Sequence, residues 1–178
     1  MSWTAVTPHR ARLGEGPFWD VPGQALYWVD IIGRQALRLQ CGQLHAWQLP
    51  EPVSAFIPCA SGDALVTLSS GVYRLDLDSP QSDPRLTLLC VADPHPGNRA
   101  NEARCDARGR LWLGTMQSNI GAQGEDLPVL RRSGGLFRVD ADGHVTPLLH
   151  GLGIPNTLLW NDEGTHVHFG DSLDGTLY

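Results

Sequence analysis

The sequence is organised by short segments rich in β-branched and aromatic residues, each followed by a turn and a second such segment. These segments begin near Leu26, Leu65, Leu111 and His166, at intervals of about 40–55 residues, and a polar insertion over 117–133 accounts for the longest interval. A repeat of ~40–45 residues is typical of one four-stranded blade of a β-propeller. The pattern therefore predicts an all-β fold of the propeller type with about four blades, and a β-sandwich or jelly roll is the alternative.

Helices are not expected, because the 20 glycines and 13 prolines are spread along the chain. No stretch longer than about ten residues combines helical apolar spacing with freedom from Gly and Pro. A chain of 178 residues is long enough for one domain with a sizeable core, so we expect a single domain over 1–178.

Composition also narrows the partners. The net charge is −6, and Lys and Arg never occur three in a row, which argues against a nucleic-acid or anionic-membrane partner and favours small molecules. The N-terminal residues MSWTAVTPHRAR lack the apolar core of a secretory signal, and no stretch approaches the ~18 apolar residues of a membrane span. We therefore expect a cytoplasmic location.

The four cysteines lie far apart with no C-x-x-C pair, which argues against a zinc ribbon or a thioredoxin-like motif. We expect reduced, mostly buried thiols. The four positions are Cys41, Cys59, Cys90 and Cys105.

Three polar clusters stand out between the predicted strands. LGEGPFWD places Glu15 between two glycines and before an aromatic pair expected to be buried; the segment 94–110 carries Arg99, Asn101 and Glu102; and GIPNTLLW sets Asn156 before an apolar strand. Taken singly, the second cluster can be a solvated loop and the third a turn asparagine, because Asn tolerates a left-handed backbone.

Together these motifs resemble the gluconolactonase, regucalcin and luciferin-regenerating-enzyme family of six-bladed β-propellers. LGEGPFWD, ALYWVDI, NRANEARCDARGRLWLGTM, GIPNTLLW and FGDS occur in that family's order over essentially the whole chain. The resemblance implies a central channel in which residues of the inner strands hold one divalent metal where a sugar lactone binds. It implies a metal-dependent lactone hydrolase, and the alternatives are a calcium-binding regulatory propeller without turnover and a purely structural or partner-binding propeller.

Carried over position by position, the resemblance makes Glu15 and Asn156 metal ligands, Asn101 a metal or substrate contact, and Arg99 a substrate contact. Asn119, just past the GTM motif, takes a position that contacts the sugar in several relatives. Carboxylate and amide oxygens suit hard cations, so Ca²⁺ is favoured, with Mg²⁺ or Mn²⁺ next and Zn²⁺ or Fe²⁺ in an open site as further alternatives. Such a cation would polarise the lactone carbonyl and activate a water.

The sequence departs from the family pattern at two places. Asn101-Glu102-Ala103 stands where the family has Asn-Asp-Gly, and Ala disfavours a left-handed backbone, so a slightly shifted loop is expected. The family's general-base aspartate would lie beyond Tyr178, so the catalytic residue stays unassigned. Asp171 is interpreted as a channel-side residue behind the ligands, with a turn-forming aspartate or a substitute ligand as alternatives.

Six blades of ~40–45 residues need roughly 240–270 residues. We therefore expect residues 1–178 to be the N-terminal part of one six-bladed domain whose final blades are absent, in a truncated or partial sequence, and a dimer that completes the ring is the alternative. Open blade edges would also permit self-association. Among the remaining residues, His166 and His168 are expected to be packing or surface histidines, and Arg131-Arg132 a solvated pair. Four tryptophans are expected in the blade core: Trp19, Trp28, Trp112 and Trp160.

Overall fold

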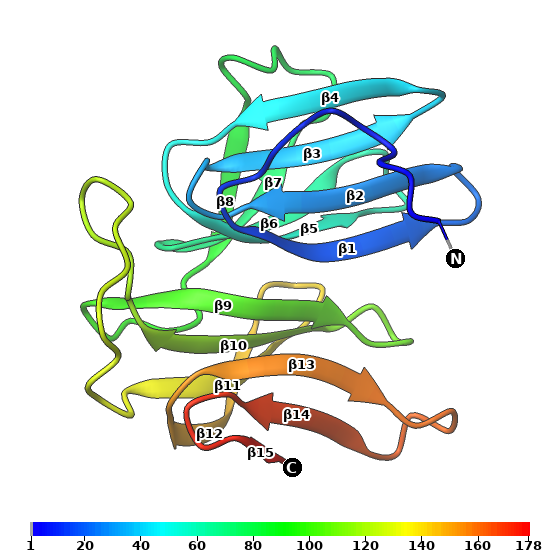
Figure 1. The fold of residues 1–178 in the computed structure, drawn as a ribbon. Coiled ribbons are helices and arrows are strands. Elements are labelled where there is room, and N and C mark those ends of the chain that lie inside the picture. Colours follow the sequence, from blue (N-terminus) through cyan, green and yellow to red (C-terminus); the bar gives the residue numbers. More distant parts are fainter. Residues whose placement is uncertain (1) are drawn as a thin grey trace.

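The computed structural model describes residues 2–178, which form fifteen β-strands in four antiparallel sheets (Figure 1). The first blade contains β1 (Gly14–Asp20), β2 (Ala25–Asp30), β3 (Gln35–Gln40) and β4 (Gln43–Gln48). The second contains β5 (Val53–Pro58), β6 (Ala64–Leu68), β7 (Gly71–Leu75) and β8 (Leu86–Cys90). The third contains β9 (Asn98–Cys105), β10 (Leu111–Gln117), β11 (Gly134–Val139) and β12 (Val145–Leu152). The fourth contains β13 (Pro155–Trp160), β14 (Val167–Asp171) and β15 (Thr176–Leu177).

Each sheet is a meander in which consecutive strands pair in chain order. The first strands of the blades, β1, β5, β9 and β13, contact one another in series, and Figure 1 shows them facing the middle of the molecule. This confirms the all-β propeller arrangement with four blades. No part of residues 2–178 forms a helix long and apolar enough to cross a membrane.

The recurring segments are the second strands of the blades, and each is preceded by a further strand on the channel side. The first strands have a weaker β-signal, because they carry the glycines, prolines and polar residues that face the channel. For the same reason the solvated-loop interpretation of 94–110 fails: its middle is strand β9.

Apolar clusters between adjacent blades form the core. Alternate residues of a strand point to opposite faces, so each sheet contributes to the cluster on either side. Tyr27 and Trp47 of the first blade meet Phe56 of the second edge-on, with ring centroids 5.1 and 5.7 Å away. Trp112 and Trp160 make a similar contact, at 5.8 Å, between the third and fourth blades. Such pairs stabilise beyond their buried area.

Two expectations about aromatic burial were wrong. Phe18 and Trp19 on β1 are 48% and 50% exposed. Trp28, Trp112 and Trp160 are half-buried; Trp112 and Trp160 do pack against a core cluster, as expected, and the fully buried tryptophan is Trp47, which the repeat pattern did not single out.

The cysteines are free, but the expectation that most are buried was wrong: Cys41 is exposed on the β3–β4 turn, and the other three are half-buried near strand ends. His166 and His168 are exposed, which agrees with the surface interpretation.

The insertion over 117–133 connects β10 to β11 and crosses from the third blade towards the first (Figure 1). Ile120 packs against the core cluster of the first two blades, and an isolated bridge pairs Ile120 with Asp126. Arg132, at its far end, forms an ion pair with Asp174 of the fourth blade, so Arg131-Arg132 is not simply a solvated pair. The insertion of the third blade therefore also contacts the first two blades and the fourth.

Candidate active site in the propeller channel

A bulge interrupts each inner strand near its start. Three residues at these bulges have no paired residue on the neighbouring strand: Ser54 of β5, Asn101 of β9 and Thr157 of β13. In β1 the register shifts between Glu15 and Phe18. Because a bulge re-aims the side chains beside it, the four blades present a set of irregular positions at one end of the channel.

Glu15 lies directly before the β1 bulge, and the next residue, Gly16, has a φ of +60°. Glycine adopts this backbone without strain, and the neighbouring glycines leave the carboxylate exposed. Burial lowers the pKa of Arg99 and raises the pKa of Glu102, both on β9; the negative charge of Glu15 opposes the first effect and adds to the second. Glu15 of the first blade is therefore electrostatically coupled to the third blade across the channel.

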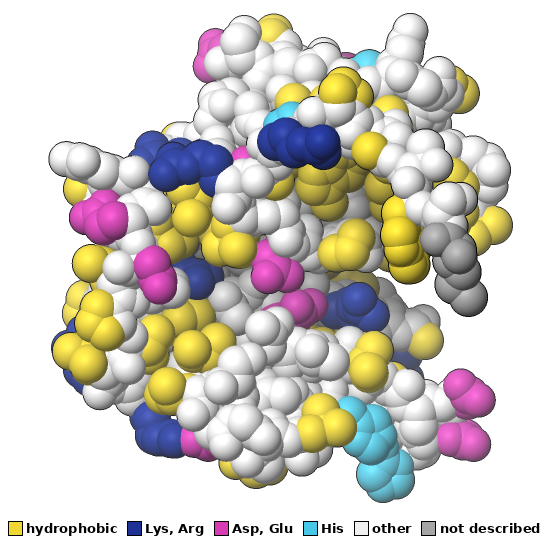
Figure 2. Space-filling view, viewed as in Figure 1, with side chains coloured by type: hydrophobic (Ala, Val, Ile, Leu, Met, Phe, Trp, Pro, Cys, Tyr) yellow, Lys and Arg dark blue, Asp and Glu magenta, His cyan; other side chains and the backbone are white. Residues whose placement is uncertain are grey.

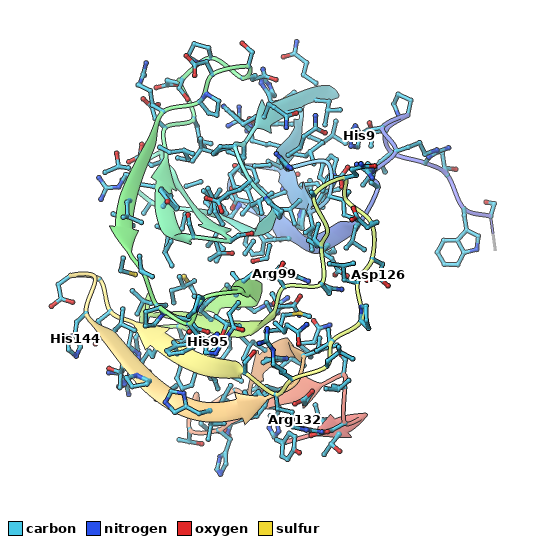
Figure 3. All side chains as sticks on the ribbon, turned by 90° about the vertical axis from the view of Figure 1, so that its left-hand side faces the viewer. His9, His95, Arg99, Asp126, Arg132 and His144 are labelled. Atoms are coloured by element: carbon cyan, nitrogen blue, oxygen red, sulfur yellow. The ribbon has the colours of Figure 1, made fainter. Side chains whose placement is uncertain are left out.

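Arg99 is the buried cation of the site, with 4% of its surface exposed. Its Nε and Nη2 donate to Asn119 Oδ1 at 3.2 and 2.7 Å, and its Nη1 donates to Asn101 Oδ1 at 3.0 Å and to the Ala100 carbonyl at 2.8 Å. Burial lowers the pKa of Arg99 to about 10, against the opposing effect of Glu15, so the guanidinium stays charged at neutral pH. Figure 3 shows Arg99 between the upper and lower halves of the molecule.

Asn101 joins two blades. Its Nδ2 donates to the Pro155 carbonyl of β13 at 2.8 Å, while its Oδ1 accepts from Arg99. Both ends of the amide are thus used by protein groups, and an arginine on the oxygen disfavours a cation there. This geometry suits Asn101 as a residue that positions its neighbours better than as a direct metal ligand.

Asn156 follows Pro155 and is half-buried. Its Oδ1 accepts from the Thr157 N–H at 3.1 Å and its Nδ2 lies 3.5 Å from Ser172 Oγ. Thr157 has a φ of +57°, a left-handed conformation that costs a β-branched residue roughly 1–2 kcal/mol. Strain of this kind persists where the surroundings fix the backbone, and here it lies directly beside a candidate ligand.

Asn119 lies on the insertion and is held at both ends. Its Oδ1 accepts the two Arg99 bonds, and its Nδ2 donates to Asp126 Oδ1 at 3.0 Å. The structure therefore brings together Arg99, Asn101 and Asn119 by direct hydrogen bonds, with Glu15 coupled to them by charge and Asn156 next to the Pro155 anchor.

Sequence reasoning did not assign three residues to this site: Ser54, Glu102 and Asp126. Burial raises the pKa of Glu102, and the negative charge of Glu15 raises it further. The positive charge of Arg104 and a hydrogen bond from the Thr157 N–H lower it in part. Glu102 thus contacts the strained bulge beside Asn156. The adjacency of Glu102 to Asn101 was a usable signal, whereas Asp126 comes from an insertion with no repeat position. Ala103 is buried within β9, so no shifted loop forms there.

Asp171 anchors backbone. Its carboxylate is 1% exposed and accepts N–H bonds from Gly153, Ile154 and Leu173 at 2.7–3.0 Å. Asp30 does the same at the corresponding end of β2. These contacts fit the turn-forming alternative for Asp171 and not a channel-side role behind the ligands.

The donor set suits a hard cation in part. Glu15 and Asn156 offer a carboxylate and an amide oxygen, the ligand types that Ca²⁺ and Mg²⁺ prefer. Among residues 2–178, no group of three or more His, Cys, Asp and Glu side chains could hold a metal ion. Figure 2 shows acidic and basic side chains meeting in the middle of the viewed face, between the two halves.

Blades around a polar channel, with an arginine, two amides and a carboxylate on its bulged inner strands, define a β-propeller. The chain belongs to the SMP-30/Gluconolactonase/LRE-like family, whose model matches residues 13–178.

Relatives and solved structures agree with this family. A 6-deoxy-6-sulfogluconolactonase of Pseudomonas putida is 32% identical over 168 residues, covering 93% of this chain and 54% of that protein. An L-arabinolactonase of Azospirillum brasilense is 32% identical over 174 residues, covering 96% of this chain and 54% of that protein. The structure resembles the calcium-binding protein regucalcin from Agrobacterium tumefaciens, with a TM-score of 0.83, 27% identity, and coverage of 97% of this chain and 55% of that one.

These solved neighbours are six-bladed propellers. The chain spans about half the length of the curated relatives it matches.

Proposed function

We propose that the chain carries the metal- and substrate-binding inner strands of a metal-dependent sugar lactone hydrolase. The observation that carries this is that the inner strands β1, β9 and β13 each have a register shift, and that Glu15, Asn101 and Asn156 lie at or beside these shifts, with Arg99 bonded to Asn101. The lactonase names of two relatives support the reaction class.

In the proposed mechanism, Glu15 and Asn156 hold a divalent cation, with Ca²⁺ favoured by the hard donor atoms. When bound, such a cation supplies Lewis acidity to the lactone carbonyl and lowers the pKa of a water. Arg99, Asn101 and Asn119 orient the lactone by donating hydrogen bonds to its oxygens. Water adds to the carbonyl carbon, the ring C–O bond breaks, and the leaving alkoxide takes a proton, giving the hydroxy acid. No residue among 2–178 is assigned as general base, and its place beyond Tyr178 stays a prediction.

A second candidate is calcium binding without turnover, which the regucalcin likeness favours. The two candidates share the metal site and differ in hydrolysis. They are therefore separated by measuring metal binding and turnover on the same preparation.

The test is acid release from glucono- and arabinonolactone, followed with a pH indicator in the presence of Ca²⁺, Mn²⁺, Mg²⁺ or Zn²⁺. We expect turnover that a chelator abolishes and that Glu15→Gln reduces at least tenfold. Glu163→Gln, an exposed carboxylate on the β13–β14 turn, is the matched control and should retain activity. Turnover indifferent to chelator and to Glu15→Gln would refute the proposal, and calorimetric Ca²⁺ binding without turnover would favour the second candidate.

A further inference from the structure

A continuous chain of hydrogen bonds runs from the insertion to the fourth blade. Asp126 accepts from Asn119, Asn119 accepts from Arg99, Arg99 donates to Asn101, and Asn101 donates to Pro155. Every link is 3.0 Å or shorter. Figure 3 shows Asp126 on the insertion and Arg99 on β9, the two charged residues that this series of hydrogen bonds connects.

The ionised carboxylate fixes the direction of the first amide. A flipped Asn119 would turn its NH₂ group towards the Arg99 donors and its oxygen towards the Asp126 oxygen, so that both contacts become repulsive. With Asp126 in place, Asn119 Oδ1 accepts twice from Arg99. Asp126 therefore sets the orientation of the group through which the insertion touches the buried arginine.

This arrangement leaves Arg99 little capacity for an anionic ligand. Four of its hydrogen bonds go to protein acceptors within the described chain, and a guanidinium has five N–H groups, so one N–H, on Nη2, is left for a ligand. A bidentate grip on a carboxylate, sulfonate or phosphate needs two parallel N–H groups. One N–H suits a single hydroxyl or carbonyl oxygen.

Resting on the proposed function, we propose that Asp126 is a specificity-determining residue that makes the site select neutral, polyhydroxylated lactones over lactones bearing an anionic group. It acts by orienting Asn119 and, through the oxygen of that amide, by occupying two N–H groups of Arg99.

The test compares kcat/KM for glucono-1,5-lactone with kcat/KM for its 6-phosphate. We expect the unmodified protein to prefer the neutral lactone and Asp126→Asn, which keeps the side-chain shape, to shrink that preference about three- to tenfold, mainly through KM. Glu125→Gln is the matched control: Glu125 precedes Asp126, bears the same charge, and bonds the Gln123 N–H of the insertion without touching Asn119. It should leave the preference unchanged. An unchanged preference in Asp126→Asn, or an equal change in Glu125→Gln, would overturn the inference.

A binding arm separates this inference from the proposed function. Calorimetry or ligand-observed NMR measures the affinities for glucitol and glucitol 6-phosphate, which cannot be hydrolysed. If the protein turns over no lactone but Asp126→Asn still reduces the ratio of its affinity for glucitol to its affinity for glucitol 6-phosphate, the proposed hydrolase function is refuted. In that case the inference about Asp126 stands. If neither polyol binds, or the phosphate binds better in the unmodified protein, the inference fails.

Discussion

The Nδ2 atom of Asn101 donates a 2.8 Å hydrogen bond to the carbonyl of Pro155, which joins the inner strands of the third and fourth blades directly beside Asn156. Pro155 is buried, so this carbonyl has little access to a replacement water. The bond therefore couples the position of a candidate metal ligand to the Arg99 network.

Replacing Asn101 with Ala should lower both stability and metal affinity. The Pro155 carbonyl would be left unsatisfied, which costs about 1–3 kcal/mol, and Asn156 would lose its fixed neighbour. Urea unfolding measures the first effect and calorimetric titration with Ca²⁺ or Mn²⁺ the second.

Asn161→Ala provides the contrast within the same blade. Asn161 holds the β13–β14 turn by bonds to Glu163, Thr165 and His166, away from the channel. Its loss should reduce stability and leave metal affinity within twofold of the unmodified value. A drop in affinity as large as that of Asn101→Ala would show that the Pro155 bond has no special role.

Thr157→Gly should stabilise the protein while weakening metal binding. The left-handed φ of Thr157 costs roughly 1–2 kcal/mol, and glycine removes that cost. Glycine also makes the unfolded chain more flexible, which lowers the stability of the folded state by about 0.5–1 kcal/mol. We expect a net gain of about 0.5–1 kcal/mol in the free energy of unfolding, with Asn156 less firmly placed.

Thr87→Gly, at an exposed position of β8, is the comparison because Thr87 has no positive φ. There the same substitution should destabilise. If Thr157→Gly destabilises as much as Thr87→Gly, the left-handed residue is not strained.

The repeat could be predicted from the sequence because second strands such as β2 and β10 carry continuous apolar residues, packed between blades. The inner strands could not be placed from propensity, since Gly14, Pro17 and Pro155 weaken the strand pattern where the channel needs bulges. Phe18 and Trp19 were expected to be buried because aromatic residues usually are, but burial depends on a neighbouring sheet that local sequence does not specify.

The site was predictable only where a motif carried it. Glu15, Arg99, Asn101 and Asn156 come from motifs in the expected order, and the structure places them at the inner strands. Asp126 lies seven residues from its partner Asn119 in an irregular insertion, and no periodic pattern indicates which of the insertion's polar residues bonds Asn119.

The pH dependence of stability should show the effect of Asp106, which closes the β9–β10 turn. Burial opposes its ionisation, but hydrogen bonds from the Arg110 side chain, the Trp112 indole, and the Arg110 and Arg108 N–H groups lower the pKa of Asp106 to about 2. A carboxyl whose folded pKa is depressed contributes stability above its unfolded pKa, near 3.9, and loses it as the pH falls towards the folded pKa.

Asp106→Asn should therefore be less stable than the unmodified protein at pH 7, and the difference should narrow between about pH 4 and pH 2. Thermal unfolding followed by circular dichroism across that range measures it. Asp162→Asn, which removes an exposed carboxylate of the β13–β14 turn, is the comparison variant. A difference for Asp106→Asn that is constant with pH would contradict the assignment.

Asp171→Asn should destabilise the protein without changing its affinity for metal. The carboxylate accepts three backbone N–H bonds at the end of β14, and an amide can present only one oxygen to them, so at least one buried donor loses its partner. We expect a loss of about 2–4 kcal/mol in the free energy of unfolding, more than for Asp174→Asn, which removes an exposed ion pair with Arg132. Urea unfolding gives the stability, and titration with Ca²⁺ at a temperature where both variants remain folded gives the affinity. Because Asp171 lies at a loop anchor equivalent to Asp30, its effect should be confined to folding. A variant that folds normally but binds metal at least tenfold more weakly would instead identify Asp171 as the substitute ligand that the sequence left open.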